Sequence, residues 1–171
     1  LVGQNDYASA LCQTSRRRDA LPILADAAAK ARQAFGADYG LTHTIQFYLG
    51  ECELANHRFA EANRSFSLVD ATKVAELTGR ADFAATLAAA RAETMLGLGD
   101  RAKAAALLDT AEAAAKASED PELKQRLQRL RAQLQNMFPN PRATASTRPA
   151  RRRARILRSG FCARAIPATV S

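Results

Sequence analysis

The chain has 171 residues, of which 47% are hydrophobic and 25% charged, which is enough to bury the core of one ordinary domain. Its formal net charge of +8 lies wholly at the end, because residues 1–138 hold 17 basic and 17 acidic side chains whereas residues 139–171 hold eight arginines and no acid. No apolar run approaches the roughly 18 residues of a membrane span, and the N-terminus lacks the basic-then-apolar pattern of a signal peptide.

The cysteines favour a reducing compartment. Cys12, Cys52 and Cys162 are an odd number without a Cys-x-x-Cys pair, which argues against a secreted disulfide framework. We therefore expect a cytoplasmic protein in which Cys12 and Cys52 are unpaired, small core residues. Because the chain begins with Leu1 rather than methionine, we also expect it to be part of a longer protein.

Three columns of apolar residues repeat along the chain at an interval of 42 residues. Within each copy their spacing is i, i+4 and i+7, which places them on one stripe of an α-helix. The small residue that heads each stripe lets another helix approach closely. The columns are Ala20, Ala62 and Ala104; Leu24, Phe66 and Leu108; and Ala27, Val69 and Ala111.

A second helical pattern precedes each stripe, so each copy is predicted to be a pair of helices. The turn between the two helices is predicted at Thr14-Ser15, Asn56-His57 and Gly99-Asp100; Gly, Asn and His are enriched at positive φ after a helix. The apolar residues of the three first helices are Tyr7, Ala8, Leu11 and Cys12; Leu49, Gly50, Cys52 and Leu54; and Ala88, Ala92, Met95 and Leu96.

These residues resemble the tetratricopeptide repeat family, in its long form with a spacing near 42 that is similar to the repeats of kinesin light chain. The family's small residue in the first helix matches Gly50 and, as alanine, Ala8 and Ala92, and its alanine in the second helix matches the column of Ala62. The junction over residues 36–42 keeps the Gly, Asp and Thr of the family's Gly-x-Asp-His-Pro-x-Thr but has Tyr39-Gly40 in place of His-Pro.

This resemblance implies an all-α fold: a superhelical solenoid of about three antiparallel helix pairs in a domain of residues 1–138. The repeats are expected at residues 3–36, 41–78 and 82–118, and a helix over 121–138 is expected to cap the last one.

Asp120-Pro121 is the start of this cap helix, and its apolar stripe alternates steps of four and three residues. A coiled-coil or dimer seam is the alternative for this stripe. It consists of Leu123, Leu127, Leu130, Leu134 and Met137, opposite a polar face that includes Arg126.

The sequence offers no combination of residues typical of catalysis. His57, Glu53 and Cys52 would supply three ligands of a zinc site, but a fourth is missing and His57 also occupies a predicted turn. The segment at residues 97–100 lacks the lysine and the preceding strand of a phosphate loop. We therefore expect no enzyme activity, metal or cofactor in these residues.

The resemblance further implies that the first helices line a concave groove that binds an extended peptide or a partner helix. Stacking of the copies would place Glu51 beside Glu93, which predicts a small, polar and acidic groove floor suited to a basic or amide-rich segment. The alternative is that these side chains are solvated and have no partner. Carried over by position, the groove residues are Thr44, Phe47, Glu51, Ala55, Thr86, Ala89, Glu93 and Gly97.

Residues 139–171 are rich in Pro, Ser, Thr, Ala and Arg, a composition that predicts a disordered basic tail. The cluster of Arg151, Arg152, Arg153 and Arg155 would attract phosphate groups of a nucleic acid or an anionic membrane surface. A second hypothesis is that the tail folds back onto Glu51 and Glu93. A third is that the tail arises from a shift of reading frame.

The sequence therefore favours a non-catalytic protein-interaction module that captures a peptide or a helix. One alternative is the C-terminal regulatory part of a larger bacterial signalling protein, such as a Ser/Thr kinase or a winged-helix transcription regulator. The other is nucleic-acid or anionic-surface binding through the basic tail, which predicts strong dependence on salt. The sequence predicts neither the partner nor the oligomeric state.

Overall fold

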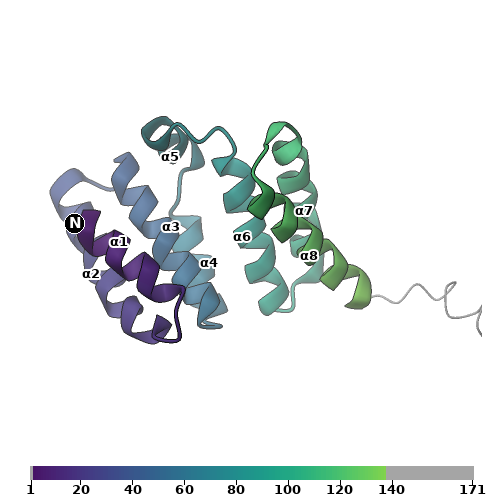
Figure 1. Ribbon diagram of the computed structural model, residues 1–171, viewed down its shortest axis with the longest axis horizontal. Helices are drawn as coiled ribbons and strands as arrows, with labels where there is room; N and C mark the ends of the chain where they lie inside the picture. Colours follow the sequence, from purple (N-terminus) through teal and green to yellow (C-terminus); the bar gives the residue numbers. More distant parts are fainter. Residues whose placement is uncertain (1, 138–171) are drawn as a thin grey trace, which may run out of the picture. The chain divides into compact units, whose positions relative to one another are not determined.

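The structure is a computed structural model that describes residues 2–137, and every regular element in this range is a helix (Figure 1). The described residues belong to the unit Leu1–Phe138. The prediction of an all-α fold is confirmed for this part of the chain. The elements are α1 (Val2–Cys12), α2 (Arg17–Phe35), α3 (Gly40–Ala55), α4 (Phe59–Ser67), α5 (Ala71–Thr78), α6 (Phe83–Gly97), α7 (Arg101–Ala114), a 3₁₀ turn (Ala115–Ala117) and α8 (Pro121–Met137).

Most helices pack against the next long helix along the chain, and the short α5 packs on α3 and α6. Thus α1 packs on α2, α2 on α3 and α3 on α4, while α4 packs on α6, α6 on α7 and α7 on α8. Contacts also join α1 to α3, α3 to α6 and α6 to α8, so the first helices of successive pairs are neighbours (Figure 1).

The three repeated columns lie in the core. Ala20, Ala62 and Ala104, which head the stripes, have no exposed surface, and eight of the nine column residues are buried. Fully burying a side chain of the size of Leu or Phe contributes about 2 kcal/mol relative to leaving it exposed. The columns are thus a main source of stability. Tyr7 differs from the expected pattern, because 56% of it is exposed on the outer side of α1.

Gly50 is required by the packing of α3 on α4. A Cβ atom at this position would lie 2.6 Å from Cε1 of Phe66, which is 1% exposed and cannot swing out. A glycine here lets the Phe66 ring lie directly on the backbone of α3. Gly50 and Phe66 therefore pack as a matched pair in the second copy.

Two turns fall where the sequence predicts them. His57, between α3 and α4, has φ 60°, and Gly99, between α6 and α7, has φ 81°. His57 is the only residue other than glycine with positive φ among the described residues. Both residues reverse the chain after a first helix, as the repeat pattern requires.

The second helix of the middle copy is broken, which differs from the predicted continuous stripe of Ala62, Phe66 and Val69. α4 ends at Ser67 and α5 begins at Ala71, so Val69 lies in the connection and is only half-buried. Asp70 caps α5 by accepting a hydrogen bond from the backbone nitrogen of Thr72 at 2.8 Å. This cap favours a new helix start over continuation of α4.

α5 also explains why residue 40, at the start of α3, is a glycine. A Cβ atom on Gly40 would lie 2.8 Å from the carbonyl oxygen of Lys73 in α5. The close approach of α5 to the start of α3 thus excludes a side chain at residue 40. The junction itself is fixed by Thr42, whose hydroxyl donates a hydrogen bond to the carbonyl oxygen of Gly36 at 2.8 Å.

α8 covers the last helix pair by packing on α6 and α7. It spans Pro121–Met137, close to the predicted 121–138, and Asp120 caps it by accepting from the backbone nitrogen of Glu122 at 2.9 Å. The four leucines of its stripe are 3–7% exposed. Burial of this stripe within the chain leaves no apolar seam of leucines for a coiled coil.

Candidate functional site

Three adjoining hollows meet on one face of the helices, and Glu51 and Arg126 line all three. The first hollow, of about 400 Å³, is lined by residues that include Ser9, Gln13, Arg17, Tyr48, Cys12 and Cys52. The second, of about 410 Å³, includes Thr86, Asp120 and Arg129. The third, of about 530 Å³, includes Leu54, Phe59, Leu96 and Gly97. Together they form one groove, called here the central groove.

An ion cluster stands at the centre of this groove. Arg126 of α8 donates from Nη2 and Nε to Glu93 of α6, at 2.8 and 3.0 Å, and from Nη1 to Glu51 of α3 at 3.0 Å. The side chains of Arg126, Glu51 and Glu93 are 18%, 30% and 41% exposed. One guanidinium thus joins three helices at the point where the hollows meet.

The local environment fixes the charge state of the guanidinium. Burial acts to lower the pKa of Arg126, but the two carboxylates outweigh this effect and raise it, so that the side chain stays protonated. Burial raises the pKa of Glu51, and Arg126 opposes that rise. The cluster therefore combines two carboxylates with one permanent cation.

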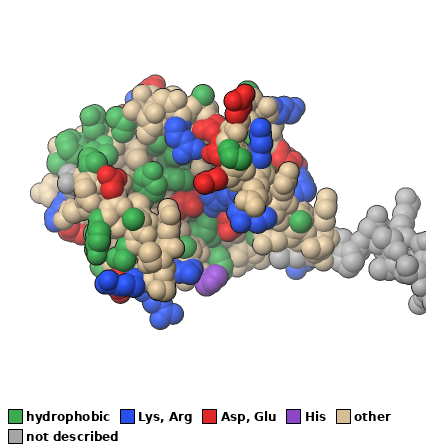
Figure 2. All heavy atoms as spheres, in the orientation of Figure 1, with side chains coloured by type: hydrophobic (Ala, Val, Ile, Leu, Met, Phe, Trp, Pro, Cys, Tyr) green, Lys and Arg blue, Asp and Glu red, His purple; other side chains and the backbone are tan. Residues whose placement is uncertain are grey.

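Charge and apolar surface are separated on this side of the molecule. In Figure 2, acidic and basic side chains adjoin over the half that holds α6 and α8, whereas hydrophobic side chains gather over the half that holds α1 to α3. The residues of the hollows follow the same division, since Tyr48 and Phe47 line the first hollow and Arg80, Asp120, Glu122 and Arg129 line the second. The groove therefore has both apolar and charged parts.

The structure distributes the predicted groove residues between surface and core. Glu51 and Glu93 are brought together through Arg126, and Ala55 and Thr86 each line two of the hollows. Gly97 is exposed in the third hollow. Thr44 is half-buried, and its hydroxyl donates to the carbonyl oxygen of Gly40 at 2.9 Å.

Phe47 and Ala89 differ from the expectation that they present surface to a partner. Ala89 has no exposed surface, and Phe47 is 5% exposed because its ring packs 4.8 Å from that of Phe83 and 5.8 Å from that of Phe66. The helices are rotated so that these side chains point into the core. The more exposed aromatic side chain of the first hollow is Tyr48, the next residue, which is 37% exposed.

Arg126 is the site residue that sequence reasoning missed, because it was assigned to the solvated face of the cap helix. Its presence also changes the predicted acidic floor into a cluster of mixed charge. The available signal is its position three residues after Leu123 and four before Leu130, which places it at the border of the buried stripe. The repeat interval gives no such signal, because Arg126 does not follow Glu93 by 42 residues.

Cys12 and Cys52 form a disulfide, which corrects the expectation of two unpaired cysteines. The bond joins the last residue of α1 to the last turn of α3. The signal for this pair is their separation of 40 residues, close to the repeat interval, which places them on neighbouring first helices. The cytoplasmic location was inferred in part from unpaired cysteines, and it stays a prediction.

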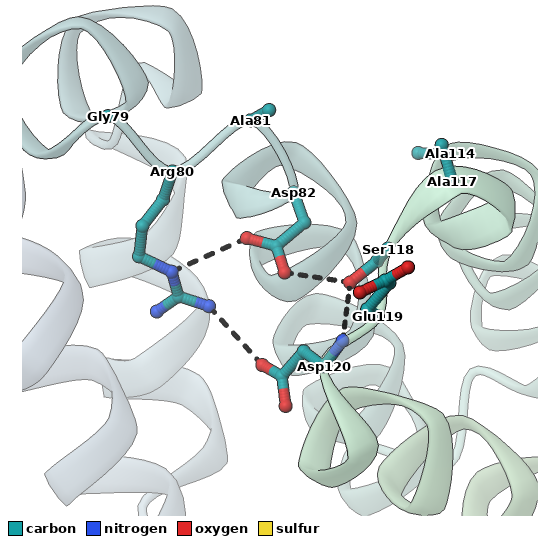
Figure 3. A pocket seen from close by; sticks show the side chains of 9 residues that line it. All are labelled: Gly79, Arg80, Ala81, Asp82, Ala114, Ala117, Ser118, Glu119 and Asp120. Atoms are coloured by element: carbon teal, nitrogen blue, oxygen red, sulfur yellow. Dashed lines mark hydrogen bonds and ion pairs between the residues drawn. The ribbon is translucent and has the colours of Figure 1, made fainter.

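A network of polar contacts beside the groove positions the start of α8 (Figure 3). Arg80 lies between Asp82 and Asp120, with nitrogen-to-oxygen distances of 3.4 and 3.6 Å. Ser118 donates from its hydroxyl to Asp82 at 2.9 Å and accepts from the backbone nitrogen of Asp120 at 3.2 Å. These contacts join the connection before α6 to the connection before α8, and thus help to place Arg126.

The side chains considered for a zinc site have other partners. Cys52 is in the disulfide, and Glu53 accepts a hydrogen bond from the hydroxyl of Ser65 at 2.6 Å. The ring of His57 packs 5.8 Å from that of Phe59. Among residues 2–137, no group of three His, Cys, Asp or Glu side chains is placed to hold a metal ion.

No family model, curated protein or solved structure matches the chain. None of the helices described in residues 2–137 has both the length and the apolar character needed to cross a bilayer. The predicted basic tail, with Arg151, Arg152, Arg153 and Arg155, lies outside the described residues.

Proposed function

We propose that residues 2–137 form a tetratricopeptide-like solenoid of antiparallel helix pairs that acts as a non-catalytic protein-interaction module. The proposed ligand is an extended peptide or a partner helix in the central groove. The order of helix contacts supports the solenoid, because each second helix packs against the next first helix, and first helices of adjacent pairs also touch.

The observation that carries the binding proposal is the continuity of the groove. Its three hollows share Glu51 and Arg126, and each has a volume of about 400 to 530 Å³. A single small molecule would fill one hollow, whereas a chain of several residues is needed to reach all three. Recognition of peptides by such surfaces uses apolar pockets for side chains and polar groups for the backbone.

The lining sets the chemistry of the ligand. Tyr48 in the first hollow and Leu54, Phe59 and Leu96 in the third offer apolar surface, while Glu93 and Arg126 between them offer a hydrogen-bond acceptor and a cation. A suitable ligand has apolar side chains on either side of a polar segment. Affinity would then come from the apolar ends and register from the central cluster.

A displayed peptide library, selected against the full chain, tests this proposal. The selected peptides are then measured by titration against two variants with the same substitution. Thr86→Arg places a long cation between the first and second hollows, whereas Thr110→Arg places it on an exposed position of α7 that lines none of the three hollows.

We expect Thr86→Arg to weaken binding by about tenfold or more, the equivalent of losing ~1.4 kcal/mol, because it obstructs the groove. Thr110→Arg should leave the affinity within about twofold of the original. Equal loss in both variants, or selected peptides that need residues 139–171 for binding, would contradict recognition by the central groove.

A further inference from the structure

The Cys12–Cys52 disulfide forms part of the wall of the first hollow. Its two sulfur-bearing residues differ in access, because Cys52 has no exposed surface whereas Cys12 is only partly buried. Cys12 is also the last residue of α1, next to the turn that leads to α2. Cys12 is therefore the more accessible of the two residues.

The surroundings of the Cys52 sulfur suit a released thiol as well as a disulfide. The carbonyl oxygen of Arg17 lies 3.6 Å from this sulfur, and the side-chain nitrogen of Asn56 lies 3.8 Å from it. A disulfide sulfur carries no hydrogen and therefore cannot donate a hydrogen bond to the Arg17 carbonyl oxygen. A released Cys52 thiol would donate to the Arg17 oxygen, and a released thiolate would accept from Asn56.

The side chain of Arg17 supplies a cation at the same hollow. Its Nη1 donates to the carbonyl oxygen of Ala55 at 2.8 Å, which holds the guanidinium beside the groove and leaves other N–H groups to donate. Among residues 2–137 it has no ion pair with a carboxylate within 4 Å. The hollow, of about 400 Å³, thus places a cation and the partly exposed Cys12 on one wall.

We propose that this disulfide is a site of reversible modification by a small acidic thiol of the glutathione class, which becomes attached to Cys12. The incoming thiolate sulfur forms a bond with Sγ of Cys12 while the Cys12–Cys52 bond breaks, and the electron pair leaves on the sulfur of Cys52. The product is one mixed disulfide and one Cys52 thiolate, which takes a proton from water. The exchange needs no other oxidant or reductant, and attack by Cys52 on the mixed disulfide reverses it.

The exchange also releases α1 from α3. The only buried residues of α1 are Asn5, Ala8 and Leu11, and buried oxygens of Asn5 and Ser9 have no hydrogen-bond partner in the described residues. α1 packs mainly on α2 and less on α3, so the covalent bond adds to its attachment to α3. Attachment of a thiol to Cys12 would therefore change the wall of the central groove.

The test uses the oxidised full chain with Cys162→Ser, which removes the one other cysteine. The protein is incubated with reduced glutathione, quenched with N-ethylmaleimide and mapped by mass spectrometry. We expect glutathione on Cys12 and maleimide on Cys52 of the same molecules, together with faster amide exchange in residues 2–12. Attachment mainly to Cys52, or no adduct under conditions that modify a denatured control, would overturn the proposal.

The role of Arg17 has a matched control in Arg18, the next residue of α2, which is exposed and does not line the first hollow. Arg17→Gln should slow modification about threefold, the range of an exposed ion pair. Arg18→Gln should leave the rate unchanged, and the diester of glutathione should react equally with both variants. Equal rates of modification by glutathione in the two variants would show that Arg17 does not contribute to the site. These measurements use none of the selected library peptides, so their outcome is independent of the proposed function.

Discussion

Glu53 is an acid in an environment that disfavours its charge. Glu53 is 8% exposed, and its carboxyl group accepts a hydrogen bond from the hydroxyl of Ser65 in α4 at 2.6 Å. Burial raises the pKa of Glu53, and the Ser65 hydroxyl and Arg58 only partly offset this effect. The folded protein therefore holds a proton on Glu53 at a pH where the unfolded chain has lost it.

The difference in the pKa of Glu53 between the folded and unfolded chain predicts a pH-dependent effect of Glu53→Gln. The wild-type carboxyl favours folding below its unfolded pKa, and this contribution is lost as pH rises to the raised folded value. Glutamine keeps an acceptor for Ser65 without a charge, so the variant should be more stable at pH 7 by about 1 kcal/mol, and the gain should fade towards pH 4. Urea unfolding from pH 4 to 8 measures it.

Glu76→Gln on α5 is the control, because this side chain is exposed. The same pH-dependent gain in both variants would indicate an effect of net charge and not of the buried carboxyl. A loss of stability for Glu53→Gln at pH 7 would show that the Ser65 hydrogen bond requires the anion.

At the scale of elements, α5 depends on a side chain from another helix. Nδ1 of His43, in α3, lies 3.0 Å from the carbonyl oxygen of Leu68 and 3.3 Å from the backbone nitrogen of Asp70. His43 is 8% exposed, so its ring is held in the interior beside this connection. The imidazole thus supplies a partner where the chain leaves α4 and has not yet started α5.

His43→Ala should destabilise the protein by about 2 kcal/mol, because it leaves a cavity and removes a hydrogen-bond partner from the backbone between α4 and α5. Amide exchange in residues 71–78 should accelerate more than that in α7. His43→Asn places a polar atom near the position of Nδ1 and should recover part of the loss. Unchanged protection of α5 in His43→Ala would contradict this role.

The break between α4 and α5 shows what the repeat pattern leaves out. Periodicity predicts which residues of a helix share a buried stripe, and the columns of Ala62 and Ala104 lie in the core accordingly. It does not predict where a helix ends when the decisive partner is distant in sequence, and His43 lies 25 residues before Leu68. The Asp70 cap was a local signal of the break, but the apolar Val69 favoured continuation.

The same limit applies to the candidate site. The position of Glu51 and Glu93 in one column follows from the interval of 42 residues, whereas the place of Arg126 depends on how α8 crosses α6. That crossing is set by packing of the leucine stripe and by the contacts of Arg80 and Ser118. Contacts of this kind arise from the fold as a whole and leave no fixed spacing in the sequence.

At the scale of the whole molecule, α8 is held by two arginines that each join two carboxylates. Arg126 binds Glu51 and Glu93 inside the central groove, while Arg131 binds Asp109 and Glu112 of α7 on the surface. Arg126 is 18% exposed and Arg131 is 32% exposed. The first cluster connects α8 to α3 across the molecule, and the second connects it only to its neighbour.

Arg126→Gln should therefore destabilise the protein by about 1–2 kcal/mol at pH 7, because two partly buried carboxylates lose their cation and repel each other. Arg131→Gln has the same chemistry at a more exposed place and should have a smaller effect that salt largely removes. Adding Glu51→Gln and Glu93→Gln to Arg126→Gln should restore most of the lost stability, since the uncompensated charges are then absent. Urea unfolding at low and high salt measures all four proteins. If the triple variant were as unstable as Arg126→Gln alone, α8 would be held in the groove by the packing of the Arg126 side chain and not by its charge.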